Sequence, residues 1–314
     1  MRDEGAGVPR GRVLAETLVD LGVPYAEING VLAAAERLAR DEEAAALLSG
    51  AVRDFVRDMG VVGGGPEGGP QLGPDLDALP SPDRWFTLLV LAATRPHTVA
   101  YHRSIGVPEE ISRRTLADVG RHLAVHQRRH GTPGLANTRW LARHFRGVLY
   151  QLGRLQFERV LLGGRSGRLL ADAGVAEGPG TLVLNVHVPD FTGPLDPGEC
   201  DASFDRARAF FPRHFPGETH AVAICHSWLL DPQLAVHLPP DSRILAFQRR
   251  FTLVYPTPSH PAAEPDDASV LGFVFGDPEA DPAGLTPRTS IQRVVLAHLS
   301  AGHHWTGGTA WRPL

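Results

Sequence analysis

The chain has 314 residues, of which 43% are hydrophobic and 21% charged, and its formal net charge is −4. This is roughly the length of two domains, with the composition of a folded globular protein. All 31 basic residues are arginine, which excludes Schiff-base chemistry on a lysine, a Walker A phosphate loop and the catalytic lysine of protein kinases.

Charge, hydropathy and cysteine content limit the classes of binding partner and the cellular compartment that we expect for the protein. The slightly acidic balance argues against nucleic acid or an anionic membrane as a partner. No stretch approaches the roughly 20 apolar residues of a membrane-spanning helix, and the charged start MRDEGAGVPRGR is unlike a secretory signal. The two cysteines, Cys200 and Cys225, are too few for a disulfide framework or a four-thiolate zinc site. We therefore expect a cytoplasmic protein.

The pattern between residues 10 and 57 is helical. An alanine-rich run dotted with charges carries an apolar face, and Asn29-Gly30 predicts a break in it. The apolar face is marked by Leu32, Leu38, Leu47 and Val52. A dense Gly/Pro block over residues 60–82 then predicts a flexible loop.

Helical signals continue after this block. Ser81 and Pro82 are typical of a helix start. Pro108 opens another helix, which we expect to run to His130, before Gly131. A further helical segment covers residues 137–147. Residues 1–150 are therefore predicted to form an all-helical N-terminal domain.

After residue 150 the spacing of the apolar residues changes from a helical period to the two-residue period of strands. The run 181–189 alternates clearly, with Leu184 and Val186 on one face and Asn185 and His187 on the other. Further strands are expected at 154–162, 219–229, 242–255, 270–275 and 305–311, and helices at 203–214, from 231, and at 290–300. The fold class predicted for the chain is α+β, in which residues 151–314 form a mixed β-sheet flanked by helices.

Several runs in this second half carry a resemblance. The order of elements over residues 181–255 resembles the core of the GNAT acyltransferase fold. The runs are NVHVPDFTGPLDPGECDASFDRARAFF (185–211), ICHSWLLDPQLAVHLP (224–239), SRILAFQRRF (242–251) and TSIQRVVLAHLSAG (289–302). They resemble a bacterial family that joins a helical N-acyltransferase N-terminal domain to a GNAT-like C-terminal domain, and the likeness spans essentially the whole chain.

The resemblance implies an acyltransferase that moves an acyl group from an acyl thioester to a small-molecule amine by direct attack. In GNAT enzymes acyl-CoA lies between two splayed strands, and backbone N–H groups at the turn into the next helix hold its diphosphate. The matching residues here are Asp190, Phe191, Thr192, Gly193 and Leu195. The implied co-substrate is acyl-CoA or acetyl-CoA, with a carrier protein as another possible donor and no metal. The alternative is a catalytically inactive GNAT-like ligand- or protein-binding module.

Acyl transfer to an amine needs a base for the ammonium proton and an acid for the leaving thiolate. His187 is the first candidate base, because it lies on the polar face of the strand that the acyl chain would pass and imidazole has a suitable pKa of about 6.5. His226, on the neighbouring strand, is the second candidate. Tyr255, at the end of the long strand, is the candidate acid. Purely structural roles remain open for all three.

A cysteine nucleophile is the competing chemistry. Cys225 and His226 are adjacent on a strand and point to opposite faces, so Cys225 could pair only with a residue such as His187. GGRSG at 163–167 approaches the nucleophile elbow Gly-x-Ser-x-Gly but does not match its sequence, and it is interpreted as a hairpin loop.

Metal binding is a weaker hypothesis. His122, His126 and His130 recur every four residues, but HLAVH lacks the glutamate of zinc-binding HExxH helices, so a solvated basic helix face is expected. The carboxyl-terminal histidines, which are His298, His303 and His304, have no carboxylate close in sequence.

Overall fold

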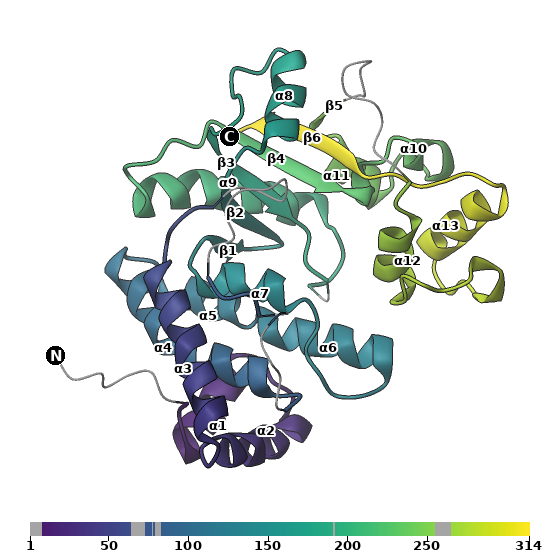
Figure 1. Cartoon of the computed structure of the whole chain (residues 1–314). Helices are drawn as coiled ribbons and strands as arrows, with labels where there is room; N and C mark the ends of the chain where they lie inside the picture. The colour runs from purple at the N-terminus through teal and green to yellow at the C-terminus, as the bar shows by residue number, and fades with distance from the viewer. Residues whose placement is uncertain (1–7, 64–72, 77, 79–82, 191, 255–264) are drawn as a thin grey trace.

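The structure of the protein is a computed structural model that describes the chain except for residues 1–7, 64–72, 77, 79–82, 191 and 255–264. The amino-terminal half is helical, as predicted, and Figure 1 shows its helices gathered below a β-sheet. These helices are α1 (Gly11–Asp20), α2 (Tyr25–Leu38), α3 (Glu42–Arg57), α4 (Phe86–Ser104), α5 (Glu109–Leu116), α6 (Asp118–His130) and α7 (Thr138–Phe145). The predicted loop at 60–82 lies largely outside the described residues, as do Ser81 and Pro82.

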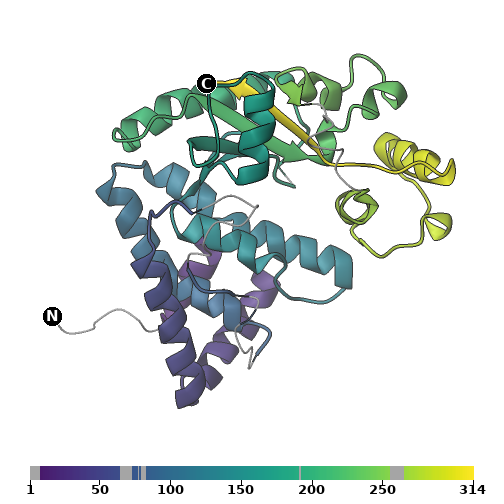
Figure 2. The ribbon, with the colours of Figure 1, turned by 45° about the horizontal axis from the view of Figure 1, so that its top comes forward.

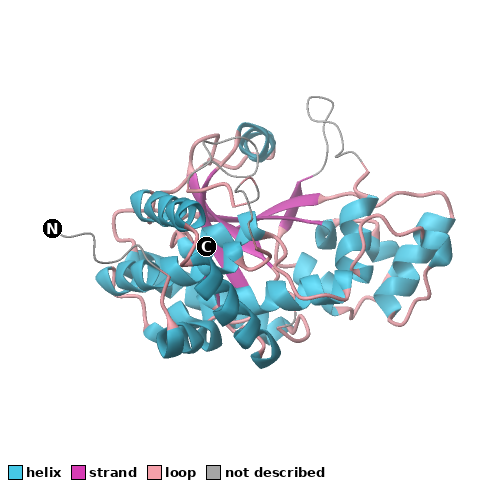
Figure 3. Cartoon of the chain, turned by 60° about the horizontal axis from the view of Figure 1, so that its bottom comes forward, coloured by secondary structure: helices cyan, strands magenta, loops and turns pink. Residues whose placement is uncertain are grey.

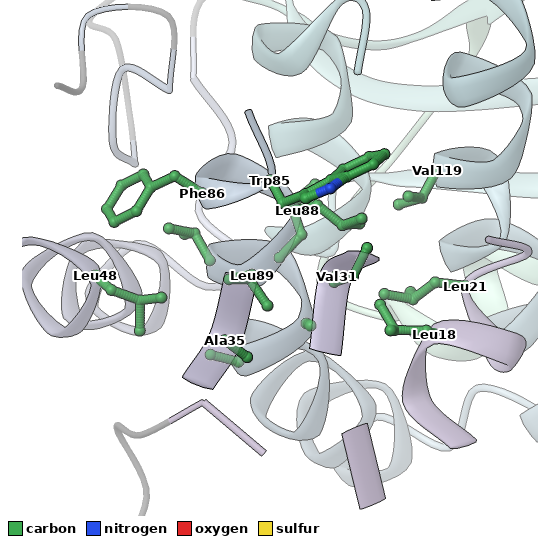
Figure 4. Packing of buried hydrophobic residues seen from close by; sticks show 14 of the residues in the cluster. Leu18, Leu21, Val31, Ala35, Leu48, Trp85, Phe86, Leu88, Leu89 and Val119 are labelled. Carbon is green, nitrogen blue, oxygen red and sulfur yellow. The ribbon is translucent and has the colours of Figure 1, made fainter. Parts of the chain in front are cut away.

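Helix α4 is the centre of this helical unit. Its first turns are apolar all round, and every residue from Phe86 to Thr94 is buried. A helix that is apolar on all sides is stable only inside a shell of other helices. Figure 4 shows Leu88 and Leu89 of α4 within that shell. The surrounding side chains include Leu18, Leu21, Val31, Ala35, Leu48 and Val119.

Two helix boundaries differ from the prediction. Asn29-Gly30 does not break the helix but lies within α2, and the chain turns earlier, at Gly22, whose φ is +75°. The helix expected from Pro108 to His130 is divided between α5 and α6. The Gly120 N–H donates to the carbonyl of Leu21 at 3.0 Å, and a Cβ on Gly120 would overlap the Gly22 carbonyl. This division comes from tertiary packing, which no local pattern reports.

The second half contains the predicted mixed sheet, whose strands lie among helices in Figure 3. Its strands are β1 (Leu149–Leu152), β2 (Leu155–Leu161), β3 (Leu182–His187), β4 (Val222–Ser227), β5 (Thr252–Val254) and β6 (Gly308–Pro313). The spatial order is β1-β2-β3-β4-β6-β5. The β3–β4 pair is parallel, and the other neighbouring pairs are antiparallel. The parallel pair requires a crossover, which helix α9 (Pro197–His214) supplies.

The two faces of the sheet have separate cores. Leu184, Val186 and Cys225 pack with the phenylalanines of α9 on one face. Val183 and Ile224 pack on the other face with Leu170 of helix α8 (Gly164–Asp172). This alternation confirms the side-chain directions expected for β3 and places Cys225 away from His187.

A carboxyl-terminal lobe extends from the open end of the sheet. It consists of α12 (Asp267–Phe275) and α13 (Ser290–Ser300), which pack around the fully buried Trp305. Figure 2 shows these two helices side by side and far from the amino terminus. Arg129 of α6 reaches the lobe and donates to the Gly272 carbonyl at 3.2 Å.

Three predicted elements of the second half are corrected. Residues 242–255 do not form one long strand, because Ser242 caps helix α11 (Arg243–Gln248) by accepting from the Ile244 N–H, and only β5 is extended. Residues 270–275 lie in α12, which Asp266 caps. Residues 163–167 are not a hairpin loop but the start of α8. Between α9 and α11 the chain also forms short turns of helix at Trp228–Leu230 and Leu234–His237 (α10), and another at Pro282–Gly284.

Candidate active site

The sheet opens into a wedge between its two parallel strands. Only two residue pairs join β3 to β4, namely Leu184 with Ala223 and Asn185 with Ile224. Both strands continue beyond these pairs, to His187 and Ser227, without further pairing to each other. We call this opening at their carboxyl ends the wedge. Because side chains alternate along strands, His187 and His226 lie on the same face, one on each side of the wedge.

His187 is held by a carboxylate that the sequence analysis did not single out. Its Nε2 lies 3.0 Å from Oε2 of Glu158 on β2, and Oε1 of Glu158 forms an ion pair with Arg143, 2.9 Å from its Nε. The edge of the Trp140 ring packs against the imidazole, with 4.4 Å between ring centroids. Arg143 and Trp140 both belong to α7, so the helical unit contributes directly to this cluster.

The electrostatics of the cluster favour a neutral imidazole beside an ionised carboxylate. Burial lowers the pKa of His187, and the hydrogen bond to Glu158 opposes this without reversing it. Burial alone would raise the pKa of Glu158, but the bond from His187 and the charge of Arg143 hold it below its usual value. Since the carboxylate can only accept, the His187 proton is on Nε2 and the lone pair is on Nδ1.

The other predicted catalytic residues are placed differently. Both ring nitrogens of His226 have hydroxyl partners: Nδ1 lies 3.0 Å from Oγ1 of Thr309, and Nε2 lies 3.3 Å from Oγ of Ser166. Burial raises the pKa of Cys225 to about 12, so this residue is a thiol in the core rather than a nucleophile. Tyr255 lies outside the described residues.

The loop between β3 and α9 follows the wedge directly. Arg154, at the turn between β1 and β2, donates to the carbonyls of Pro189, Gly193 and Pro194 at 3.0–3.2 Å. The carbonyls of this loop therefore point back to one guanidinium. Among the described residues, the backbone N–H groups of Thr192, Gly193 and Leu195 make no hydrogen bond.

Side chains of this loop and of the residues before α9 also make specific contacts. Asp190 pairs with Arg128 of α6 at 3.4 Å, and Thr192 donates to the Pro189 carbonyl at 3.0 Å. The Asp196 carboxylate accepts from the N–H groups of Gly198 and Glu199, so the first donors of α9 are already used. Phe191 lies outside the described residues.

A second buried carboxylate lies next to the Glu158 cluster. Asp118, at the start of α6, contacts His144 at 3.0 Å and His122 at 3.3 Å, and its other oxygen accepts from Gln156 at 3.2 Å. Burial lowers the pKa of His122 to about 4, so the expectation that this histidine lies on a solvated face is wrong. This carboxylate joins α6 and α7 to β2.

The carboxyl-terminal histidines form a ring cluster. His298 contacts His237 at 3.1 Å and packs against Trp305, and His304 bonds to Asp267 at 2.6 Å. In the part of the chain that the structure describes, no three metal-ligating side chains converge on one point. None of the described helices combines the length and the apolar character needed to cross a membrane.

The strand order, the wedge at its parallel pair and the crossover helix define a GNAT-type acyltransferase. A family model of the GNAT-like C-terminal domain matches residues 149–311, and a model of the N-acyltransferase N-terminal domain matches residues 13–147. The chain belongs to the family of N-acyltransferases that join these two domains.

Solved structures of acyltransferases agree with this assignment. One, in complex with decanoyl-CoA and teicoplanin, is 37% identical with a TM-score of 0.82, over 100% of this chain and 91% of the other. Another, in complex with CoA and 10C-teicoplanin, is 37% identical with a TM-score of 0.83 over the same shares. A third, with decanoyl-CoA, is 34% identical with a TM-score of 0.81, over 98% and 89%. No curated protein matches the chain.

The comparisons confirm the fold class, the family and the kind of enzyme predicted from the sequence. They favour a working acyltransferase over the inactive binding module that the sequence left open. The resemblance did not identify Glu158, Arg143 or Arg154. In the run 154–162, Glu158 stands among the other polar residues Arg154, Gln156 and Arg159, so its charge alone did not distinguish it.

Proposed function

We propose that this enzyme transfers a medium-chain acyl group from acyl-CoA to an amine of a glycopeptide-type acceptor, with His187 as the general base. The observation that carries the proposal is the Glu158–His187 pair at the wedge. The solved acyltransferases at 34–37% identity, in complexes with decanoyl-CoA, CoA and teicoplanin, support the choice of donor and acceptor. Because acyl-CoA is a cytoplasmic metabolite, we also propose that the enzyme is cytoplasmic. An acyl carrier protein is the alternative acyl donor.

The pair has the arrangement that a general base requires. Glu158 holds the proton on Nε2, so Nδ1 of His187 is the atom that accepts the proton of the attacking amine. The carboxylate then stabilises the imidazolium that forms, while Arg143 keeps Glu158 ionised. His226 has partners at both nitrogens, so we assign it a structural role at the other side of the wedge. Tyr255 stays a candidate acid on the sequence alone.

We also propose that the loop at residues 190–195 binds the CoA diphosphate. Asp190, Phe191, Thr192, Gly193 and Leu195 were expected to do so through the start of the following helix. The cap by Asp196 makes the first turn of α9 a poor anion site, since its donors are used. Support comes instead from the loop itself, whose carbonyls face Arg154 and whose N–H groups have no described partner.

A transfer assay tests the proposed function. Wild-type enzyme, decanoyl-CoA and a teicoplanin-type glycopeptide that bears a free amine are expected to give a decanoylated product by mass spectrometry, together with one free CoA thiol. His187→Ala should lower kcat by about 10²- to 10⁴-fold, because it removes general base catalysis, while decanoyl-CoA still binds.

The control is His226→Gln, which can keep hydroxyl contacts to Thr309 and Ser166 and should retain most of the rate. An unchanged rate in His187→Ala together with a large loss in His226→Gln would move the base to His226. Wild-type enzyme that acylates no amine from any acyl-CoA would refute the function itself.

A further inference from the structure

Asn185 lies at the apex of the wedge. It is the last residue of β3 that pairs with β4, opposite Ile224, and on its other side it pairs with Glu158 of β2. Direct cross-strand neighbours share a face, so the side chains of Asn185 and Glu158 lie on the same side of the sheet. His187, two residues further along β3, lies on that side as well. The amide is therefore next to the proposed base and at the closed end of the opening.

The side chain of Asn185 is buried, at 3% exposure; its acceptor Oδ1 has no hydrogen-bond partner, and its donor Nδ2 makes no hydrogen bond among the described residues either. Its polar neighbours on the same face differ in this respect. Gln156 bonds to Asp118, Glu158 bonds to His187 and forms an ion pair with Arg143, and His226 bonds to Thr309 and Ser166. A buried amide without a partner destabilises a fold, so a native protein that keeps one needs a reason outside folding.

We propose that the side-chain amide of Asn185 donates a hydrogen bond to the thioester carbonyl oxygen of acyl-CoA and stabilises the oxyanion formed there. This inference rests on the proposed function, because it assigns the second catalytic group of the same reaction. A donor aimed at the position where negative charge develops is a large contribution to acyl-transfer catalysis. The apex is the place where a thioester lying in the wedge meets β3.

The step balances with the groups present. The amine nitrogen forms a bond to the carbonyl carbon, the C=O electron pair moves to oxygen, and Nδ1 of His187 takes the amine proton. When the tetrahedral intermediate collapses, the C=O bond re-forms and the C–S bond breaks. The sulfur leaves with the bonding pair and takes the proton from the imidazolium. The products are an amide and the free thiol of CoA.

The spacing of the two groups fits this chemistry. Residues i and i+2 of a strand have Cα atoms about 6.7 Å apart on one face. That separation leaves room for a tetrahedral carbon between the Asn185 amide and the His187 imidazole. Because both residues belong to β3, their separation does not depend on how far β4 stands from β3.

Two variants of similar shape test the assignment. Asn185→Leu removes both polar atoms, and Asn185→Asp keeps the size but removes the N–H donor. Each is expected to lower kcat by about 10²- to 10³-fold, because one oxyanion donor is lost. The Kd for decanoyl-CoA, measured by calorimetry, should rise far less than kcat falls, because the hydrogen bond strengthens as the oxyanion forms. Thermal unfolding should show Asn185→Leu at least as stable as the wild type, whereas Gln156→Leu, which removes a buried amide that has partners, should be less stable.

A spectroscopic readout separates catalysis from structure. With decanoyl-CoA labelled with ¹³C at the thioester carbonyl, the bound C=O stretch should lie at lower frequency in the wild type than in either variant. A wild-type kcat in Asn185→Leu, or the same C=O frequency in wild type and variants, would overturn the assignment. If the wild type shows the frequency shift but acylates no amine, the proposed function fails while the Asn185 contact stands.

Discussion

Burial and nearby charges act in opposite directions on the protonation state of His187. Burial and the positive charge of Arg143 lower the pKa of its imidazole, and the bond to Glu158 raises it. The net pKa lies below the usual value of about 6.5, so the base is neutral at pH 7. We therefore expect kcat/KM to rise with pH and to reach its plateau before neutrality.

Two variants should shift this pH profile in opposite directions. Glu158→Gln removes the group that stabilises the imidazolium, so the acid limb of kcat/KM should move to lower pH and the plateau should fall. Arg143→Gln removes a nearby positive charge, so the acid limb should move to higher pH. Stopped-assay profiles from pH 5 to 9 measure both. Shifts in the same direction, or no shifts, would contradict this electrostatic account of the base.

The sequence predicted the orientation of single residues correctly where the alternation of side chains along a strand was sufficient to determine it. The faces of His187 and Cys225 follow from the period of β3 and β4. The partner of His187 does not, because the contact with Glu158 depends on the register of β2 against β3 and the contact with Trp140 depends on how α7 packs. Burial of His122 likewise depends on how α6 packs against the sheet, where Asp118, its neighbour on the helix, accepts from Gln156 of β2.

At the scale of elements, the loop between β3 and α9 is organised by one arginine. If Arg154 orients the carbonyls of Pro189, Gly193 and Pro194, its removal should disorder the N–H groups that we assign to the diphosphate. Arg154→Gln is expected to raise KM for acyl-CoA by about tenfold or more, with a smaller effect on kcat, because ground-state binding is lost.

Arg208→Gln provides the matched control, since it removes the same charge from the exposed side of α9. Initial rates over a range of decanoyl-CoA concentrations give both constants. Equal KM values for Arg154→Gln and Arg208→Gln would leave the loop without a role in CoA binding.

The elements that the sequence predicted well are those with a strong internal period, such as β3 and α13. The wrong assignments fall on short apolar runs, where strand and helix patterns are hard to distinguish. In α11 and α12 the capping residues Ser242 and Asp266 start a helix that the apolar composition alone does not reveal. A capping residue can be recognised in the sequence. Whether the following segment forms a helix or a strand also depends on whether a neighbouring strand is available to pair with it.

At the scale of the whole molecule, buried neutral histidines tie stability to pH. Burial lowers the pKa of His102 and of His122 to about 4, and that of His144 well below its usual value. The unfolded chain binds these protons near pH 6.5, so it holds more protons than the native state between about pH 6.5 and 4. The stability is therefore complete above pH 6.5 and is lost as the pH falls toward 4.

This linkage makes a quantitative prediction. Each such histidine adds up to about 1.4 kcal/mol per pH unit to the slope of the unfolding free energy in that window. His102→Gln should make the slope shallower by about that amount, because glutamine does not titrate. Urea unfolding at pH 7, 6 and 5 measures it. A slope as steep in His102→Gln as in the wild type would remove His102 from the linkage.

The two residue pairs between β3 and β4 divide the sheet into two half-sheets, β1-β2-β3 and β4-β6-β5. The base and the proposed oxyanion donor both belong to the first half, while His226 belongs to the second. The mutual geometry of the reacting groups is therefore set within β3 and does not depend on the spacing between the two half-sheets. A donor in the wedge also faces β4, which carries neither of these two groups, so we expect the fit of the acyl chain and the alignment of the reacting groups to depend on different strands of the same sheet.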